Sequence, residues 1–300
     1  MQRNLDIAQL FREHPDFILT LTTDHSETLN WLRETNLLQT RTLCCRMECN
    51  VVRDTRRLDG EEFRCQNQSC RRRFSIRRQS IWQRFAKTPL IVLVRLVFYY
   101  FVNQIPAKRA ARLLNRAGFI TSGRTVQRVY KTVRNKIKTY MDDVVFSGVL
   151  RGTIEIDEAL FTHPSVPGRR GQRQVWAIGM VERNSGIGYA FIVDNRNHAT
   201  INQLIRRYVL PGSLIIHDGW QGYTRIPLPW RHVELDHENG ITTSQIEGLW
   251  GQLRAIIRNM YFGGVVEGNV EAVLTEALWR RNLELAEEDV LEELIRVLLH

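Results

Sequence analysis

The chain has 300 residues, of which 43% are hydrophobic and 25% are charged, and its net charge at pH 7 is +10. This composition is ordinary for a globular protein, and the length allows two or three domains. A membrane protein is not expected, because the longest apolar run, residues 90–102, contains Arg95 and is too short to cross a bilayer. A secretory signal is not expected either, because the first ten residues are polar and mixed.

The positive charge is concentrated in one segment of the chain. Residues 41–150 hold 24 Lys and Arg against 7 Asp and Glu, a balance of +17, whereas the segments before and after it carry −3 and −4. Such a local excess is typical of a nucleic-acid binder, so we expect double-stranded DNA as the partner. The alternative is a solvated basic face that binds nothing.

All five cysteines lie between positions 44 and 70. Cys65 and Cys70 form one closely spaced pair, and Cys49 forms another with either Cys45 or Cys44. Two such pairs in a long chain indicate one structural zinc ion with four thiolate ligands rather than a disulfide framework. We expect the ligands to be Cys45, Cys49, Cys65 and Cys70. The choice between Cys44 and Cys45 stays open, as does the alternative of unligated buried cysteines.

The residues around these cysteines predict a small β-hairpin module. Asp59-Gly60 is a turn signal, and an arginine-rich stretch follows Cys70. Arginines on a rigid ribbon suit contacts with DNA phosphates. The candidates for these contacts are Arg71, Arg72, Arg73, Arg77 and Arg78.

Three helices are predicted next, over residues 89–103, 106–115 and 122–141. Pro106 suits the first position of the second helix, and Gly118 ends it. A short helix, a turn containing glycine and a longer basic helix favour a helix-turn-helix. The third helix would then read bases through Arg124, Arg128 and Lys131. A plain helical bundle with a basic exterior is the alternative.

From residue 150 the pattern changes to alternating apolar strands. The predicted strands are residues 152–160, 174–182, 188–194, 213–217 and 232–235. A helix over 199–210 separates the third strand from the fourth, and another helix is predicted over 243–259. Three strands in succession suggest an antiparallel meander, and the helix then crosses over to a strand beside the first. This is the arrangement of the ribonuclease H-like fold.

Three acidic residues in this region are candidates for catalysis. Asp157 lies in the first strand, Asp218 ends the fourth, and Glu247 lies on the last helix. A carboxylate in an apolar strand is costly unless it is paired or bound to metal, so the three suggest a site for two divalent cations. Alternatively, Asp218 is only a turn residue and Glu247 a solvated one. Glu155 shares the strand face of Asp157 and is the local rival for a metal role.

Several short stretches resemble the motifs of a known family. They are Ile154-Glu-Ile-Asp-Glu158, Pro211–Tyr223, Gln245–Arg254, Leu278-Trp-Arg-Arg-Asn282, and the cysteine-rich stretch that leads to Phe74-Ser-Ile-Arg77. Over residues 40–283 the chain resembles transposases of the Merlin superfamily, which are related to bacterial insertion-sequence transposases. The resemblance implies a DDE triad at Asp157, Asp218 and Glu247, a ribonuclease H-like fold, Mg²⁺ dependence and DNA transposition.

The expected architecture is therefore α/β, a ribonuclease H-like catalytic domain preceded by a zinc ribbon and a helix-turn-helix region. The predicted segments are 1–40, helical; 41–80, zinc ribbon; 81–148, helix-turn-helix; 149–283, catalytic; and 284–300, an acidic helix.

The expected activity is cut-and-paste transposition by a homodimer or larger oligomer that binds transposon ends and target DNA. Two Mg²⁺ ions, replaceable by Mn²⁺, would serve the triad, and one Zn²⁺ would serve the ribbon. We expect the nucleus in a eukaryotic host and otherwise a bacterial cytoplasm. The alternatives are a DNA-binding regulator that has lost catalysis and a structure-specific nuclease of the same fold.

Overall fold

A computed structural model of the chain describes residues 21–101, 104–144, 148–161, 174–260, 270–287 and 290–300. The chain divides into two compact units. The first comprises Met1–Val133 with Asp289–His300, and the second comprises Arg134–Glu288. The connection between the predicted strands 152–160 and 174–182 falls almost entirely outside the described residues.

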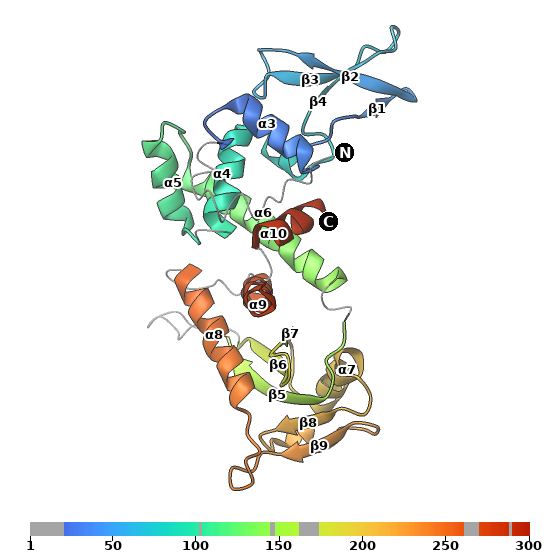
Figure 1. The fold of residues 1–300 in the computed structure, drawn as a ribbon, viewed down its shortest axis with the longest axis vertical. Coiled ribbons are helices and arrows are strands. Elements are labelled where there is room, and N and C mark those ends of the chain that lie inside the picture. Colours follow the sequence, from blue (N-terminus) through green and yellow to red (C-terminus); the bar gives the residue numbers. More distant parts are fainter. Residues whose placement is uncertain (1–20, 102–103, 145–147, 162–173, 261–269, 288–289) are drawn as a thin grey trace. The chain divides into compact units, whose positions relative to one another are not determined.

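The first unit contains a four-stranded antiparallel sheet in the order β1-β2-β3-β4 (Figure 1). Its strands are β1 Leu43–Cys44, β2 Met47–Arg53, β3 Glu61–Cys65 and β4 Arg73–Ser75. Gly60 adopts a φ of +71° in the turn between β2 and β3, where glycine is favoured. The predicted hairpin module is therefore present, and Phe63 and Ile76 are its fully buried apolar residues.

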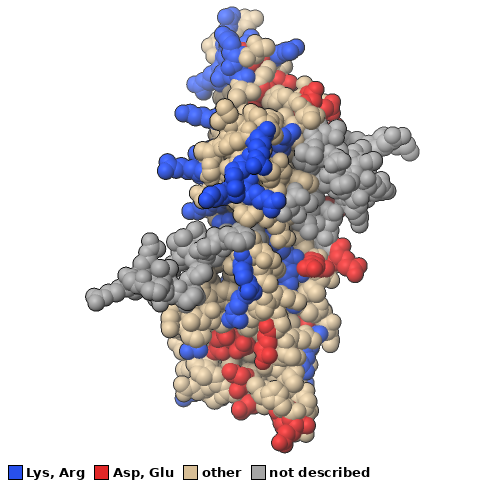
Figure 2. Space-filling view, turned by 90° about the vertical axis from the view of Figure 1, so that its left-hand side faces the viewer, with Lys and Arg blue, Asp and Glu red and all other residues tan. Residues whose placement is uncertain are grey.

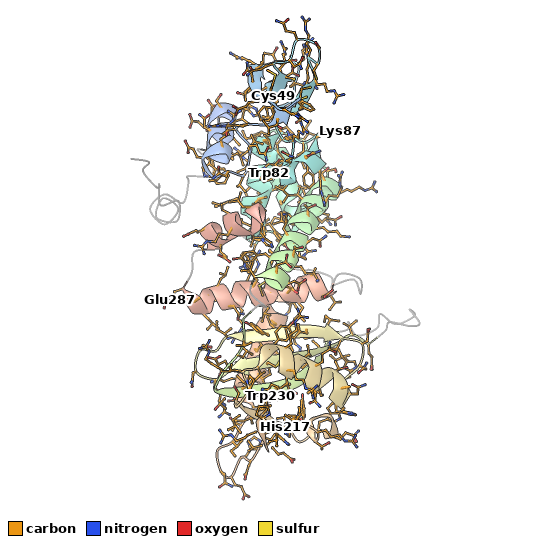
Figure 3. All side chains as sticks on the ribbon, turned by 90° about the vertical axis from the view of Figure 1, so that its right-hand side faces the viewer. Cys49, Trp82, Lys87, His217, Trp230 and Glu287 are labelled. Carbon is orange, nitrogen blue, oxygen red and sulfur yellow. The ribbon has the colours of Figure 1, made fainter. Side chains whose placement is uncertain are left out.

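Helices complete the first unit: α3 His25–Glu34, η1 Ile81–Phe85, α4 Leu90–Phe101, α5 Ala107–Arg116, the first half of α6 Gly123–Asp143, and α10 Val290–Leu299. The apolar run that was too short for a bilayer forms α4, which is buried over most of its length. Trp82 lies in this helical core (Figure 3), and its indole N–H donates to the carbonyl of Leu37 at 2.9 Å. Among the described residues, no helix is both long enough and apolar enough to cross a membrane.

The second unit contains a five-stranded sheet in the order β7-β6-β5-β8-β9. Its strands are β5 Thr153–Leu160, β6 Trp176–Glu182, β7 Gly188–Val193, β8 Leu214–His217 and β9 Arg231–Glu234. The pairs β5–β6 and β6–β7 are antiparallel, whereas β8 runs parallel to both β5 and β9. Helix α7, His198–Tyr208, connects β7 to β8. The predicted meander and crossover are therefore confirmed, and this strand order is the one expected of a ribonuclease H-like core.

Two further helices, α8 Ser244–Met260 and α9 Val270–Ala286, belong to this unit, and α9 contacts both α8 and β7. The stretch Leu278–Asn282 lies on α9 and has a structural role. Asn282 donates to the carbonyl of Gly188 at 2.9 Å and so satisfies the backbone where β7 begins. Arg281 contacts the Gln252 side chain on α8 at 2.6 Å and the carbonyl of Gly186 at 2.8 Å. These bonds hold α9 to the sheet and to α8.

Candidate active site

The register of the sheet brings two of the expected acids together. Glu155 on β5 is paired with Ile216 on parallel β8, so Asp157 and Asp218, each two residues further on, reach the same level. Asp218 also accepts the backbone N–H of Trp220 at 2.9 Å, and Gly219 takes a φ of +83° in the turn. Asp218 is therefore a turn residue as well as a member of the site.

A third carboxylate joins them, and it is not the expected one. Asp157, Glu158 and Asp218 each offer a carboxylate oxygen, and these oxygens all lie within 4.8 Å of one another. Strand alternation predicts that Glu158 points away from Asp157. However, the pairing of β5 with β8 ends at Glu155, so the strand edge next to Glu158 is open and its longer side chain reaches the cluster.

The environment makes it costly to charge these groups. Burial raises the pKa of Asp157, and the charges of Asp218 and Glu247 raise it further, against hydrogen bonds that lower it. Burial raises the pKa of Glu158 to about 7. The Tyr223 hydroxyl lies close enough to lower that pKa somewhat, yet the contact falls short of hydrogen-bond geometry. A bound cation would favour the charged forms of these carboxylates.

Glu247 lies outside this compact group. It is exposed in the first turn of α8, and the Thr243 hydroxyl is 3.4 Å from its carboxylate. Its charge nevertheless contributes to the raised pKa of Asp157, so it lies within electrostatic range of the cluster. Its place in a triad stays a prediction.

Glu155, the expected rival for a metal role, is an anchor for α8 instead. Its side chain is 0% exposed, and one carboxylate oxygen accepts the backbone N–H groups of Gln245 and Ile246, each at 2.9 Å. The other oxygen accepts from Arg183 Nε at 2.7 Å. A carboxylate at a helix N-terminus satisfies unpaired N–H groups and complements the helix dipole. Glu155 therefore fixes the start of the helix that carries Glu247.

An indole fixes Asp157 from the same helix. Trp250 Nε1 donates to Asp157 Oδ2 at 3.0 Å, and Trp250 is buried. The ring lies over Gly179, the residue that pairs with Asp157 across β5 and β6. A Cβ at Gly179 would lie 2.5 Å from the Trp250 ring, so only glycine fits here. Neither residue is among the candidates predicted from the sequence, although Trp250 lies inside one of the motif stretches.

A histidine pair supports the turn that carries Asp218. His217 is buried on β8 (Figure 3), and its Nδ1 accepts the N–H of Gly219 at 3.0 Å. The neutral ring therefore carries its proton on Nε2, which donates to His232 Nδ1 at 3.0 Å. Burial, together with the charge of His232, lowers the pKa of His217 to about 4. His217 also stacks on Tyr223, with ring centroids 4.9 Å apart. It is a packed residue rather than a phosphate contact.

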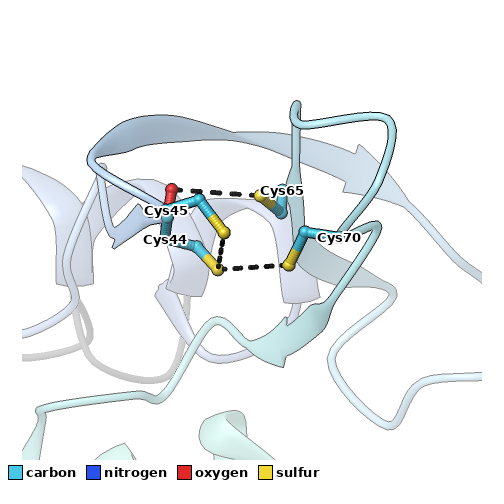
Figure 4. A group of neighbouring side chains, drawn as sticks. All are labelled: Cys44, Cys45, Cys65 and Cys70. Atoms are coloured by element: carbon cyan, nitrogen blue, oxygen red, sulfur yellow. Dashed lines mark hydrogen bonds between the residues drawn. The ribbon is translucent and has the colours of Figure 1, made fainter.

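Four thiols of the first unit form a second cluster. The Sγ atoms of Cys44, Cys45, Cys65 and Cys70 lie within 4.8 Å of one another (Figure 4). Cys44 Sγ is 3.8 Å from Cys45 Sγ and 3.7 Å from Cys70 Sγ. In a tetrahedral site with Zn–S bonds of about 2.3 Å, neighbouring sulfurs are about 3.8 Å apart. The cluster therefore fits a four-thiolate zinc ion and supports a zinc ribbon.

This set differs from the expected one by a single residue. Cys44 takes the place of Cys49, which lies buried on β2 opposite Cys65. Cys45 and Arg46 both have positive φ in the β1–β2 turn, and this tight turn brings Cys44 and Cys45 to the same point. The backbone N–H of Arg72 contributes most to lowering the pKa of Cys70 to about 7, which favours the thiolate that a metal requires.

The expected DNA-contacting side chains divide into accessible and structural ones. Figure 2 shows Lys and Arg side chains gathered over one face of the first unit. The exposed members of the predicted set are Arg71, Arg72, Arg73, Arg124, Arg128 and Lys131. Arg73 also approaches Asp54 and Glu62, and the half-buried Arg78 lies over the Phe74 ring at 4.3 Å.

Arg77 does not belong to this surface. It is 2% exposed, is ion-paired with Asp59, and donates to the carbonyls of Phe85 and Thr88, each at 2.7 Å. The prediction that Arg77 contacts phosphate is therefore wrong, because the guanidinium joins the β2–β3 turn to the helical core.

Residues 149–282 match the family model described as the ISXO2-like transposase domain. This match supports a DDE transposase family for that segment. It covers β5 to α9, and thus every acid of the candidate site, whereas a Merlin subtype remains a prediction. No curated protein sequence matches the chain.

Among solved structures, the chain is similar to the catalytic core domain of BIV integrase, with 19% identity and a TM-score of 0.32 over 42% of this chain and 80% of that one. It is also similar to a chain of the simian T-cell lymphotropic virus intasome in complex with PP2A regulatory subunit B56 gamma. That identity is 14% and the TM-score 0.34, over 44% of this chain and 48% of the other.

Proposed function

We propose that the protein is a DNA transposase that cuts transposon ends and joins them to target DNA. The observation that carries the proposal is the placement of Asp157, in the middle of β5, beside Asp218, which follows the end of parallel β8, inside a segment that matches a transposase domain. Glu247, on a helix anchored to the same strand, would complete the triad.

The residues present fit a divalent cation such as Mg²⁺. Hard carboxylate oxygens are the ligands that Mg²⁺ prefers, and the cluster offers three of them in a partly buried place. Asp157, Asp218 and Glu247 would hold two ions. When bound, the ions activate the attacking water or 3′-hydroxyl and neutralise the leaving oxygen.

The chain's own contribution is to hold these ligands in place. Trp250 orients the carboxylate of Asp157, and the His217 ring supports the turn that presents Asp218. Glu155 secures the first turn of α8 and therefore the position of Glu247. Ligands held in advance lose little freedom when the reaction begins.

The first unit is proposed to bind the DNA. Its exposed basic side chains suit phosphate contacts, and the four-thiol cluster would hold the ribbon in shape through one zinc ion. Recognition of terminal inverted repeats by Arg124, Arg128 and Lys131 on α6, and assembly as a homodimer on two DNA ends, are part of the same proposal.

The decisive experiment compares wild type with Asp157→Asn on labelled duplexes made from the DNA that flanks the coding sequence, in Mg²⁺ or Mn²⁺. We expect wild type to cut and join, and Asp157→Asn to do neither while it still binds DNA, because the lost charge is a cation ligand. The exposed Asp194 provides the control variant Asp194→Asn, which should cut normally.

Each alternative gives a different result in this assay. Cutting by Asp157→Asn at the wild-type rate would exclude the site. A wild-type protein that binds DNA without cutting it would be a regulator, and one that cuts without joining would be a nuclease.

A further inference from the structure

Glu158 carries a polar atom that the proposed triad does not use. Its Oε1 is buried and has no hydrogen-bond partner within the described part of the chain. The positively charged side chain of Arg196 acts electrostatically on Glu158, but no ion pair joins the two. The guanidinium of Arg196 is instead stacked on the Trp176 ring, at 3.6 Å from the ring centroid. A buried carboxylate oxygen without a donor is costly, so a ligand is the natural partner for it.

A second, independent group points at the same place. Tyr223 is 0% exposed, and its hydroxyl also lacks a hydrogen-bond partner among the described residues. The carboxylates of Glu158, Asp157 and Asp218 all act electrostatically on this hydroxyl. Its ring is held by stacking on His217 and by an edge contact with Trp220, whose centroid is 6.0 Å away. The hydroxyl is therefore aimed into the acidic cluster by rigid neighbours.

We infer that Glu158 is a metal ligand alongside Asp157 and Asp218, and that Tyr223 is the positioning residue that orients it. This inference rests on the proposed function and extends it, because it adds a carboxylate that lies outside the triad. One oxygen of Glu158 would contact the cation, and the other would accept the Tyr223 hydroxyl. Both buried atoms would then be satisfied, and the charge of the ion would offset the repulsion among three carboxylates.

The geometry also separates Glu158 from Glu247. Glu158 lies inside the 4.8 Å cluster, whereas Glu247 is exposed on α8 and outside it. The protein without DNA is therefore expected to hold one divalent cation through Asp157, Glu158 and Asp218. Glu247 would be needed for cleavage but not for this first binding event.

The test measures Mn²⁺ binding to the full chain without DNA, by electron paramagnetic resonance of the free ion. Mn²⁺ prefers oxygen ligands, so it does not compete for the thiolates. We expect Glu158→Gln and Tyr223→Phe each to weaken Mn²⁺ binding by about tenfold or more, the range seen when ligand-orienting partners are removed. Glu247→Gln should bind Mn²⁺ as wild type does and yet fail to cleave DNA.

Two additional measurements keep the test sharp. Circular dichroism establishes that each variant is folded, and Glu158→Asp, which keeps the charge but withdraws the oxygen, should also bind more weakly. Wild-type Mn²⁺ affinity in Glu158→Gln, or no Mn²⁺ binding by wild type without DNA, would overturn the inference even if wild type cuts DNA. Conversely, the expected binding pattern in a protein that never cuts DNA would refute the proposed function and leave the cation site standing.

Discussion

Replacing Glu155 by alanine tests how the fold positions the site. The carboxylate receives two backbone N–H groups from the first turn of α8 and one guanidinium N–H from Arg183. Alanine would leave these three donors without their acceptor, in a place where the carboxylate itself is 0% exposed. The change therefore removes the bonds between β5 and the first turn of α8, whereas the Trp250–Asp157 bond and the acidic cluster keep their own groups.

The expected loss of stability follows from the burial of Glu155 and Arg183. Breaking a buried ion pair by removing one member costs about 3–5 kcal/mol. The Arg183 side chain is 28% exposed and can regain some water, so the lower end, about 3 kcal/mol, applies. A domain is stable by about 5–15 kcal/mol in total, so such a loss is large but does not by itself unfold the protein.

Urea denaturation and hydrogen exchange measure this effect. We expect Glu155→Ala to lower the midpoint of unfolding of the second unit and to accelerate exchange of the amides at the start of α8. Glu155→Gln keeps one acceptor oxygen and should be intermediate. Glu238→Ala, at an exposed position, is the matched control and should leave both measurements unchanged.

Two results would contradict the anchor role of Glu155. If Glu155→Ala unfolds like wild type and the α8 amides exchange at the wild-type rate, Glu155 is not an anchor. If Mn²⁺ affinity is lost in the same variant, Glu155 is a ligand, as its place on the strand face of Asp157 first suggested.

Three further predictions follow from the site and the thiol cluster. Gly179→Ala should cost about 1–3 kcal/mol of stability and slow DNA cleavage, because the new methyl group displaces the Trp250 indole of α8. The control Gly248→Ala, with open space around its Cβ position, should change neither stability nor cleavage. Equal stability and equal cleavage rates of the two variants would contradict this prediction. In EDTA, the free energy of unfolding of wild type relative to Glu158→Gln should fall as the pH rises from about 4.5 to about 7. The reason is that folding raises the pKa of Glu158 to about 7, so the stability contributed by the protonated carboxyl is lost over this range. A difference in free energy that is constant with pH would exclude a raised pKa of Glu158. Elemental analysis should find about one zinc per chain in wild type and in Cys49→Ala but not in Cys44→Ser; zinc kept by Cys44→Ser and lost from Cys49→Ala would instead favour the ligand set expected from spacing.

The order of the catalytic strands was predictable because it depends on local patterns. Alternating apolar residues and turn signals mark β5 to β9, and the crossover through α7 leaves one simple way to place β8 beside β5. The meeting of Asp157 and Asp218 then follows, since Asp157 lies in the middle of β5 and Asp218 follows the end of the adjacent parallel strand β8. The buried helix α4 was predictable for the same reason, because a continuous apolar run must be covered.

The roles of individual polar residues were not predictable in this way. Alternation placed Glu155 on the strand face of Asp157 and Glu158 on the opposite face, whereas in the structure Glu155 anchors α8 and the Glu158 carboxylate lies beside those of Asp157 and Asp218. Spacing predicted Cys49 as a ligand and left Cys44 out, whereas two positive φ angles in a tight turn bring Cys44 into the thiol cluster and Cys49 lies outside it. Composition placed Arg77 among the DNA contacts, but Asp59 holds it in the interior.

The elements, their order and the level at which Asp157 and Asp218 meet can therefore be derived from local sequence patterns. Which acidic groups join the cluster and which anchor a helix depends on the packing of the fold. A periodic pattern predicts only the face of a helix or strand on which a residue lies. Whether a charged side chain is paired, buried or exposed depends on partners that are distant in the chain. Glu155 finds its donors 90 and 91 residues later, and Asp157 finds the Trp250 indole 93 residues later. Contacts at such separations form only when the sheet and α8 pack together.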